Sequence, residues 1–190
     1  MKYTLLATVI AGLVGSAALA GSPEPYIEEV YMPAPQPVAD WAGFYAGGTG
    51  GIQSGTITPG FTFDATTYGG FAGYNMQSGN LVYGVEIAAQ TGTIRLPPSF
   101  DLDYVVDAKA RIGYSLGDAL LYASGGYTTT DTGLLGLTAS GWNAGAGLDY
   151  AVTDKFFLGG EYTYRNLPNT TPGGFDYASH GGQLRAGIRF

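Results

Sequence analysis

Few side chains in this sequence could carry catalysis. Cysteine is absent and His180 is the single histidine, with Ser179 directly before it. A serine nucleophile needs a base within hydrogen-bond reach, but neighbouring residues of a strand point to opposite faces of the sheet. Ser179 and His180 are therefore badly placed to share a proton. We expect no catalytic residue and no enzyme activity. A lipid A-modifying enzyme that uses His180 is only a distant alternative.

Metal, cofactor and nucleic-acid sites are not expected either. With one histidine and no cysteine, clusters of these metal ligands are excluded. Asp101 and Asp103 form a single acidic pair, which is weak support for a divalent cation. The glycine-rich stretches 47–51 and 145–147 are not followed by a helix pattern, so they do not fit a phosphate-binding loop. The formal net charge of −7, without a basic patch, argues against nucleic acid as a partner.

Nine of the charged side chains follow a two-residue period. Asp107, Lys109 and Arg111 alternate with apolar residues, and Glu161 and Arg165 do the same further along the chain. This period is that of a strand with one polar and one apolar face. The charges assigned to the polar face are Glu86, Asp107, Lys109, Arg111, Asp149, Glu161, Arg165, Arg185 and Arg189. A sheet that carries them must present two very different faces.

Eight segments of about ten residues position these side chains. They span residues 43–52, 67–77, 81–91, 104–115, 119–128, 140–152, 156–166 and 179–190. Short connections at 78–80, 116–118 and 153–155 alternate with longer ones at 53–66, 92–103, 129–139 and 167–178. The 32 glycines and 15 tyrosines disfavour helices and suit strands and turns. The pattern predicts an all-β fold, an eight-stranded antiparallel transmembrane up-and-down β-barrel with its short turns in the periplasm.

Two segments precede the predicted barrel domain, which spans residues 41–190. Residues 1–20 have a basic start at Lys2, an apolar stretch and the small residues Ala18-Leu19-Ala20, a pattern typical of a secretory signal peptide cleaved after Ala20. Residues 21–40 are rich in proline and acidic side chains and form a predicted periplasmic linker. This linker is either a plain tether or a contact to peptidoglycan or another periplasmic partner.

The two faces distinguish a membrane barrel from a soluble one. A soluble barrel of the lipocalin kind would line its cavity with apolar residues. Here the charged face alternates acid and base among many glycines, and the aromatic residues of the other face would form interfacial girdles in a membrane. The predicted lipid-facing girdle residues are Tyr83, Tyr114, Trp142, Tyr150, Tyr162 and Tyr164. We expect this face to contact outer-membrane lipid and lipopolysaccharide, while the parity of segments 43–52 and 119–128 stays open.

The charged face then points into the lumen. Isolated charges in a narrow interior are costly, so a nearly balanced set predicts a salt-bridge network that fills it. Counting from the turns predicts two pairs, Glu86–Lys109 and Glu161–Arg185. A lower group near the periplasmic mouth is predicted to contain Arg111, Asp149 and Arg189. The alternative is a narrow porin-like diffusion channel for small solutes, because lumen glycines leave room for water.

Several stretches resemble the small alphaproteobacterial outer-membrane surface barrels, the outer-membrane immunogenic or porin-opacity type. The similar stretches are WAGFYAGG at 41–48, ARIGY at 110–114, LYASGG at 121–126, GW at 141–142, GAGLDY at 145–150, EYTY at 161–164 and RAGIRF at 185–190. The resemblance implies a Gram-negative surface antigen of the cell outer membrane, with a structural or host-facing role and no enzyme motif. The final Phe190 resembles the C-terminal signal that the barrel-assembly machinery recognises.

Overall fold

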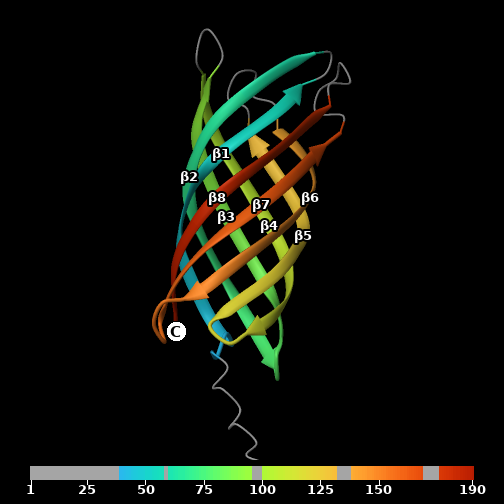
Figure 1. The fold of residues 1–190 in the computed structure, drawn as a ribbon. Helices are drawn as coiled ribbons and strands as arrows, with labels where there is room; N and C mark the ends of the chain where they lie inside the picture. The colour runs from blue at the N-terminus through green and yellow to red at the C-terminus, as the bar shows by residue number, and fades with distance from the viewer. Residues whose placement is uncertain (1–38, 58–59, 96–99, 132–137, 169–175) are drawn as a thin grey trace, which may run out of the picture. The chain divides into compact units, whose positions relative to one another are not determined.

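A computed structural model describes residues 39–57, 60–95, 100–131, 138–168 and 176–190. The predicted signal peptide and residues 21–38 of the predicted linker lie outside the described residues. The strands are β1 (Gly43–Ile57), β2 (Phe61–Ser78), β3 (Leu81–Arg95), β4 (Phe100–Leu116), β5 (Ala119–Asp131), β6 (Thr138–Ala151), β7 (Phe156–Leu167) and β8 (Tyr177–Arg189). Each strand pairs antiparallel with the next, and β8 pairs with β1 to close the barrel (Figure 1). The predicted fold class is confirmed.

The strands extend further than the sequence predicted. Residues 53–66 were expected to form a loop, but β1 and β2 stay paired up to Ile57 and Phe61. The pairing of β3 and β4 likewise reaches Ile94 and Phe100, beyond a register shift between Gln90 and Gly92. The error has a physical cause: the backbone ladder continues where the outward side chains become polar, so the apolar alternation stops before the strands do. The barrel wall therefore rises above its apolar band.

The three tight turns lie together at one end of the barrel, here called the turn end. Gly79 and Gly117 adopt left-handed φ values of 60° and 68°, which suit glycine in a two-residue hairpin. In the third turn, Thr153 Oγ1 accepts a hydrogen bond from the backbone N–H of Phe156, with an N–O distance of 2.9 Å. The start of β1 and the end of β8 lie at this same end, as Figure 1 shows. The opposite end is called the loop end. Within the described part of the chain, no helix has the length and apolarity to cross a bilayer.

The outer face of the wall is apolar and aromatic. Five of the predicted girdle residues are exposed there, namely Tyr83, Tyr114, Trp142, Tyr150 and Tyr162. The sixth, Tyr164, is half-buried because its ring packs against Trp142, with ring centroids 5.5 Å apart. A belt of large exposed apolar side chains around a closed sheet is the arrangement of a barrel whose solvent is lipid.

The core near the turn end is also aromatic, and here the sequence left the parity of two segments open. Tyr45 of β1 and Tyr122 of β5 point inward and are buried, together with Trp41, Phe71 and Phe157. Four of these rings lie over a glycine directly across the ladder, in the pairs Tyr45–Gly73, Phe71–Gly47, Tyr122–Gly147 and Phe157–Gly187. A Cβ at any of these glycines would overlap the ring that covers it. Glycine on one strand thus makes space for an aromatic ring on its neighbour.

Candidate functional site

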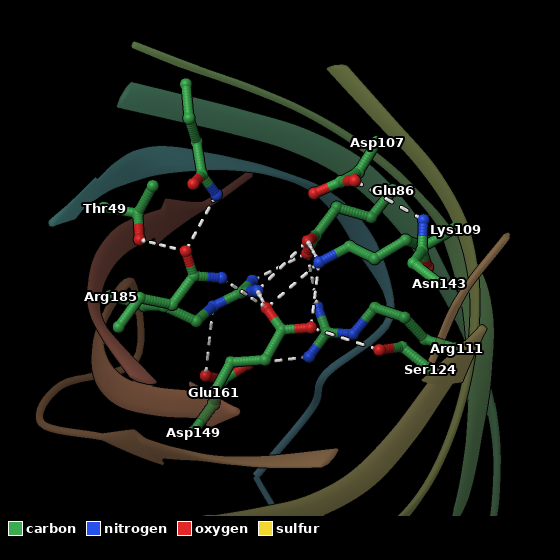
Figure 2. Close-up of polar contacts among 12 residues, drawn as sticks. Thr49, Glu86, Asp107, Lys109, Arg111, Ser124, Asn143, Asp149, Glu161 and Arg185 are labelled. Carbon is green, nitrogen blue, oxygen red and sulfur yellow. Dashed lines mark hydrogen bonds and ion pairs between the residues drawn. The ribbon is translucent and has the colours of Figure 1, made fainter. Parts of the chain in front are cut away.

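The middle of the lumen holds six charged side chains from five strands. This central cluster consists of Glu86, Lys109, Arg111, Asp149, Glu161 and Arg185. Glu86 is its hub: its carboxylate lies 3.0 Å from Lys109 Nζ, 2.9 Å from Arg111 Nη1 and 2.6 Å from Arg185 Nη2. These side chains converge from opposite walls of the barrel (Figure 2).

A second acid links the same cations from the other side. Glu161 lies 2.8 Å from Lys109 Nζ and 2.6 Å from Arg185 Nη1. Asp149 completes the set at 2.8 Å from Arg111 Nη2. The cluster has three acids and three bases, and its side chains are only 0–3% exposed. Such burial is tolerable because every charge has an opposite partner and the sum is neutral.

Aromatic rings complete the surroundings of the two arginines. The guanidinium of Arg111 lies 3.8 Å from the ring centroid of Tyr122, and that of Arg185 lies 4.1 Å from the centroid of Phe71. The rings cover the flat faces of the guanidinium groups, while the N–H groups at the guanidinium edges donate hydrogen bonds to carboxylates. Tyr45 also takes part, because its hydroxyl accepts from Arg111 Nη1 at 2.8 Å and lies 3.0 Å from Glu86 Oε2. The aromatic core and the ionic cluster are therefore one packed unit.

A second ion pair lies nearer the loop end. Arg165 Nη2 is 2.6 Å from Asp107 Oδ2, and Thr128 Oγ1 donates to the other oxygen of this carboxylate at 2.6 Å. Arg165 also donates to Gln53 Oε1 at 3.3 Å. All four side chains are buried. The charges of this level balance within the pair, as they do in the central cluster.

Amide side chains fill the space between the two levels. Gln183 donates to Glu161 Oε2 at 3.0 Å and accepts from Gln90 Nε2 at 2.8 Å, and from Thr49 Oγ1 at 3.1 Å. A cavity of about 10 Å³ remains beside them, lined by Thr67, Thr163 and Arg165 among others. That volume is about the space of one water molecule. The polar lumen is packed rather than open at this height.

At the turn end, one cation is held by carbonyl groups instead of acids. Arg189 donates to the backbone oxygens of Asp40 at 2.6 Å, Asp154 at 3.0 Å and Thr153 at 3.2 Å. Its guanidinium also lies 4.5 Å from the ring centroid of Trp41, whose side chain is only 2% exposed. Trp41 and Arg189 are called the terminal latch here, because they fasten the segment before β1 across the end of the lumen.

Trp41→Ala is expected to release this segment while leaving the barrel folded. Removing a fully buried indole costs several kcal/mol locally, so cleavage between residues 39 and 45 by proteinase K should be at least about tenfold faster. The measurement is the rate of that cleavage in detergent, followed by mass spectrometry. Tyr83→Ala, which truncates an exposed aromatic residue on the outer wall, should leave the rate unchanged. Equal rates for Trp41→Ala and the parent protein would contradict the latch.

The structure places all nine charges of the predicted polar face on the inside of the barrel. Both predicted pairs are present, Glu86–Lys109 and Glu161–Arg185. Arg111 and Asp149 lie one step nearer the turn end than Lys109 and Glu161 along the ladder, in the direction predicted. They are nevertheless part of the central cluster, because the long Arg111 side chain reaches Glu86, while Arg189 lies apart from the cluster at the turn end. Sequence reasoning also missed Tyr45 and Gln183, because neither carries a charge that would mark its face.

His180 and Ser179 lie on opposite faces of β8, as the strand period predicts. Ser179 is buried inside the barrel, whereas His180 is exposed outside, with its ring 6.2 Å from that of Tyr162. The two side chains therefore form no Ser–His pair. Asp101 and Asp103 lie in β4 rather than in the predicted loop.

Comparison with known proteins agrees with this geometry. The family of the outer membrane protein beta-barrel domain matches residues 29–190. The chain is 32% identical to the 25 kDa outer-membrane immunogenic protein of Brucella canis over 180 residues, covering 86% of this chain and 84% of the relative. It is also 32% identical to the 22 kDa outer membrane protein of Rhizobium leguminosarum bv. viciae over 142 residues, 68% of this chain and 65% of that protein. The crystal structure of neisserial surface protein A matches 78% of this chain and 96% of its own, at 21% identity and a TM-score of 0.54, which supports the fold.

Proposed function

Because the chain belongs to the outer membrane protein β-barrel family and is an outer-membrane protein, we propose that it is a closed, non-enzymatic barrel with a structural role in the envelope. In this proposal the turn end faces the periplasm and the loop end presents surface-exposed segments for interactions. The barrel wall contacts outer-membrane lipid, and residues 21–40 tether the barrel to peptidoglycan or another periplasmic partner. Phe190 serves as the signal for the barrel-assembly machinery.

The observation that carries this proposal is the central cluster. Its ion pairs cross the lumen from β3 and β4 to β7 and β8, with Lys109 Nζ within 3.0 Å of Glu86 and within 2.8 Å of Glu161. Opening a path for ions would require breaking contacts between fully buried charges, which is costly. Arg165 and Asp107 close a second level, and the terminal latch covers the turn end. These three barriers favour a structural role over a diffusion channel.

Planar-bilayer recordings test the closed lumen. The purified protein is expected to give no stable single-channel steps, whereas a known porin inserted by the same procedure gives them. The porin shows that insertion and recording work. Stable steps from this protein, with a conductance that changes in Glu161→Ala, would support the porin-like channel and overturn the closed-lumen proposal.

A further inference from the structure

Outside the barrel, one row of polar side chains crosses four neighbouring strands. Ser54 of β1 is the ladder partner of His180 on β8 and of Asp64 on β2, and Asp64 is the partner of Arg95 on β3. All four lie on the outer face: Asp64, Arg95 and His180 are exposed, and Ser54 stands between the buried residues Gln53 and Gly55. The outer polar row is the name used here for His180, Ser54, Asp64 and Arg95. The sequence did not reveal it, since its members are up to 126 residues apart in the chain.

The row carries a preorganised acceptor beside a groove. Ser54 Oγ donates to Asp64 Oδ1 at 2.7 Å, which fixes the carboxylate. A groove of about 370 Å³ runs along Ser54, Asp64, Tyr164 and His180. Arg95 is exposed, and among the described residues its Nη2 donates one long hydrogen bond, to Thr66 Oγ1 at 3.3 Å. Since the Ser54 proton goes to Asp64 and the described contacts give no bond from Ser54 to His180, this arrangement suits binding rather than nucleophilic catalysis.

The height of the row on the wall indicates which solvent it meets. On the turn-end side, the same strands carry Ile52, which is 72% exposed, and Tyr68, which is 62% exposed. Exposed apolar and aromatic side chains of this kind mark the hydrocarbon and its interface. Toward the loop end, the outward residues Thr56 and Thr62 are polar. The outer polar row therefore begins where the apolar band ends, at the level of lipid headgroups on the loop-end side.

We propose that the outer polar row binds the phosphorylated sugar headgroup of an outer-leaflet glycolipid. The Arg95 guanidinium matches a phosphate group in a forked, charge-assisted contact. The oriented Asp64 carboxylate accepts from sugar hydroxyl groups in the groove, and His180 supplies a ring N–H at the far end of the row. A phospholipid headgroup offers a phosphate but lacks the ring of hydroxyls that would use Asp64. The proposal rests on outer-membrane location and loop-end orientation, and is independent of whether the lumen is closed.

Lipid binding by the full-length mature protein in detergent tests the site. The probes are a bis-phosphorylated diglucosamine glycolipid, the same glycolipid without phosphates, and phosphatidylglycerol, and binding is measured by native mass spectrometry. The parent protein is expected to prefer the phosphorylated glycolipid over both others. Arg95→Gln should weaken that binding about tenfold, as expected for loss of one charge-assisted contact, and Asp64→Asn should weaken glycolipid binding but not phosphatidylglycerol binding.

Matched controls lie on the opposite rim. Lys155→Gln removes an exposed positive charge from the turn end, as Arg95→Gln does at the row, and Asp118→Asn removes an exposed negative charge there, as Asp64→Asn does. Both control variants should bind the glycolipid like the parent. Heat-dependent gel migration of each variant shows that the barrel is folded. The proposal is overturned if Arg95→Gln binds as tightly as the parent, if the control variants lose as much affinity, or if the three lipids bind equally. None of these results bears on the conductance experiment.

Discussion

Glu86→Gln is expected to lower the free energy of unfolding by about 3–5 kcal/mol, the cost typical of removing one partner from a buried ion cluster. Glutamine keeps the shape of the side chain but not its charge. Lys109, Arg111 and Arg185 would then face only Glu161 and Asp149, so one buried positive charge is left without compensation. Urea unfolding in lipid vesicles, followed by tryptophan fluorescence, measures the change.

The control for this prediction makes the central cluster neutral again without restoring the hydrogen bonds of the Glu86 carboxylate. In Glu86→Gln/Lys109→Met, two arginines face two carboxylates, and a flexible apolar chain replaces the lysine stem. We expect this double variant to regain a large part of the lost stability, so that the two substitutions are strongly non-additive. Asp118→Asn, on an exposed turn, should change stability by less than about 0.5 kcal/mol. A parent-like midpoint for Glu86→Gln would contradict an energetic role for the cluster.

Gly73→Ala is expected to destabilise the barrel by about 1–3 kcal/mol, although alanine is the smallest possible addition. The new Cβ would overlap the hydroxyl end of the Tyr45 ring and lie 2.6 Å from the backbone oxygen of Val85. Tyr45 would have to move, and its hydroxyl is bonded to Arg111 and close to Glu86. The substitution therefore disturbs the ionic cluster through an aromatic residue, and the same urea experiment measures it.

Gly182→Ala provides the matched control. Gly182 lies on the outer face of β8, and a Cβ there meets nothing within 4 Å. The same chemical change should therefore leave stability within about 0.5 kcal/mol of the parent. The double variant Tyr45→Leu/Gly73→Ala removes the ring that causes the overlap, so the glycine substitution should cost much less in that background. If Gly73→Ala and Gly182→Ala change stability equally, the Tyr45 ring does not need a glycine at position 73, and the proposed overlap is contradicted.

The wall of the barrel and the ionic cluster are packed together through the inward aromatic rings. The inward aromatic residues occupy the space that glycines leave, and they pack against the arginines of the central cluster. In the proposed function, this packing leaves little freedom to open a path for solutes, as a structural role in the envelope requires. The outer polar row is a separate feature of the opposite face of the sheet, and it can be altered without touching this interior.

The sequence by itself determined the period of two, the number of strands and the face of the nine charges that line the lumen. These properties are local: Lys109 and Arg111 share a face because successive side chains of a strand alternate. The resemblance to outer-membrane surface barrels, confirmed by the family match, was equally carried by short contiguous stretches. Where local patterning failed, as in segments 43–52 and 119–128, small residues on both parities removed the contrast between the faces.

Only the tertiary structure decided which charges meet. Glu86 and Arg185 are 99 residues apart and touch because the barrel closes and their side chains reach across the lumen. Closure also set the register that puts Ser54 between His180 and Asp64 on the outer wall. Alternation fixes the face of a residue but not its height relative to a distant strand. That height follows from the stagger of the closed ladder, which is a property of all eight strands together.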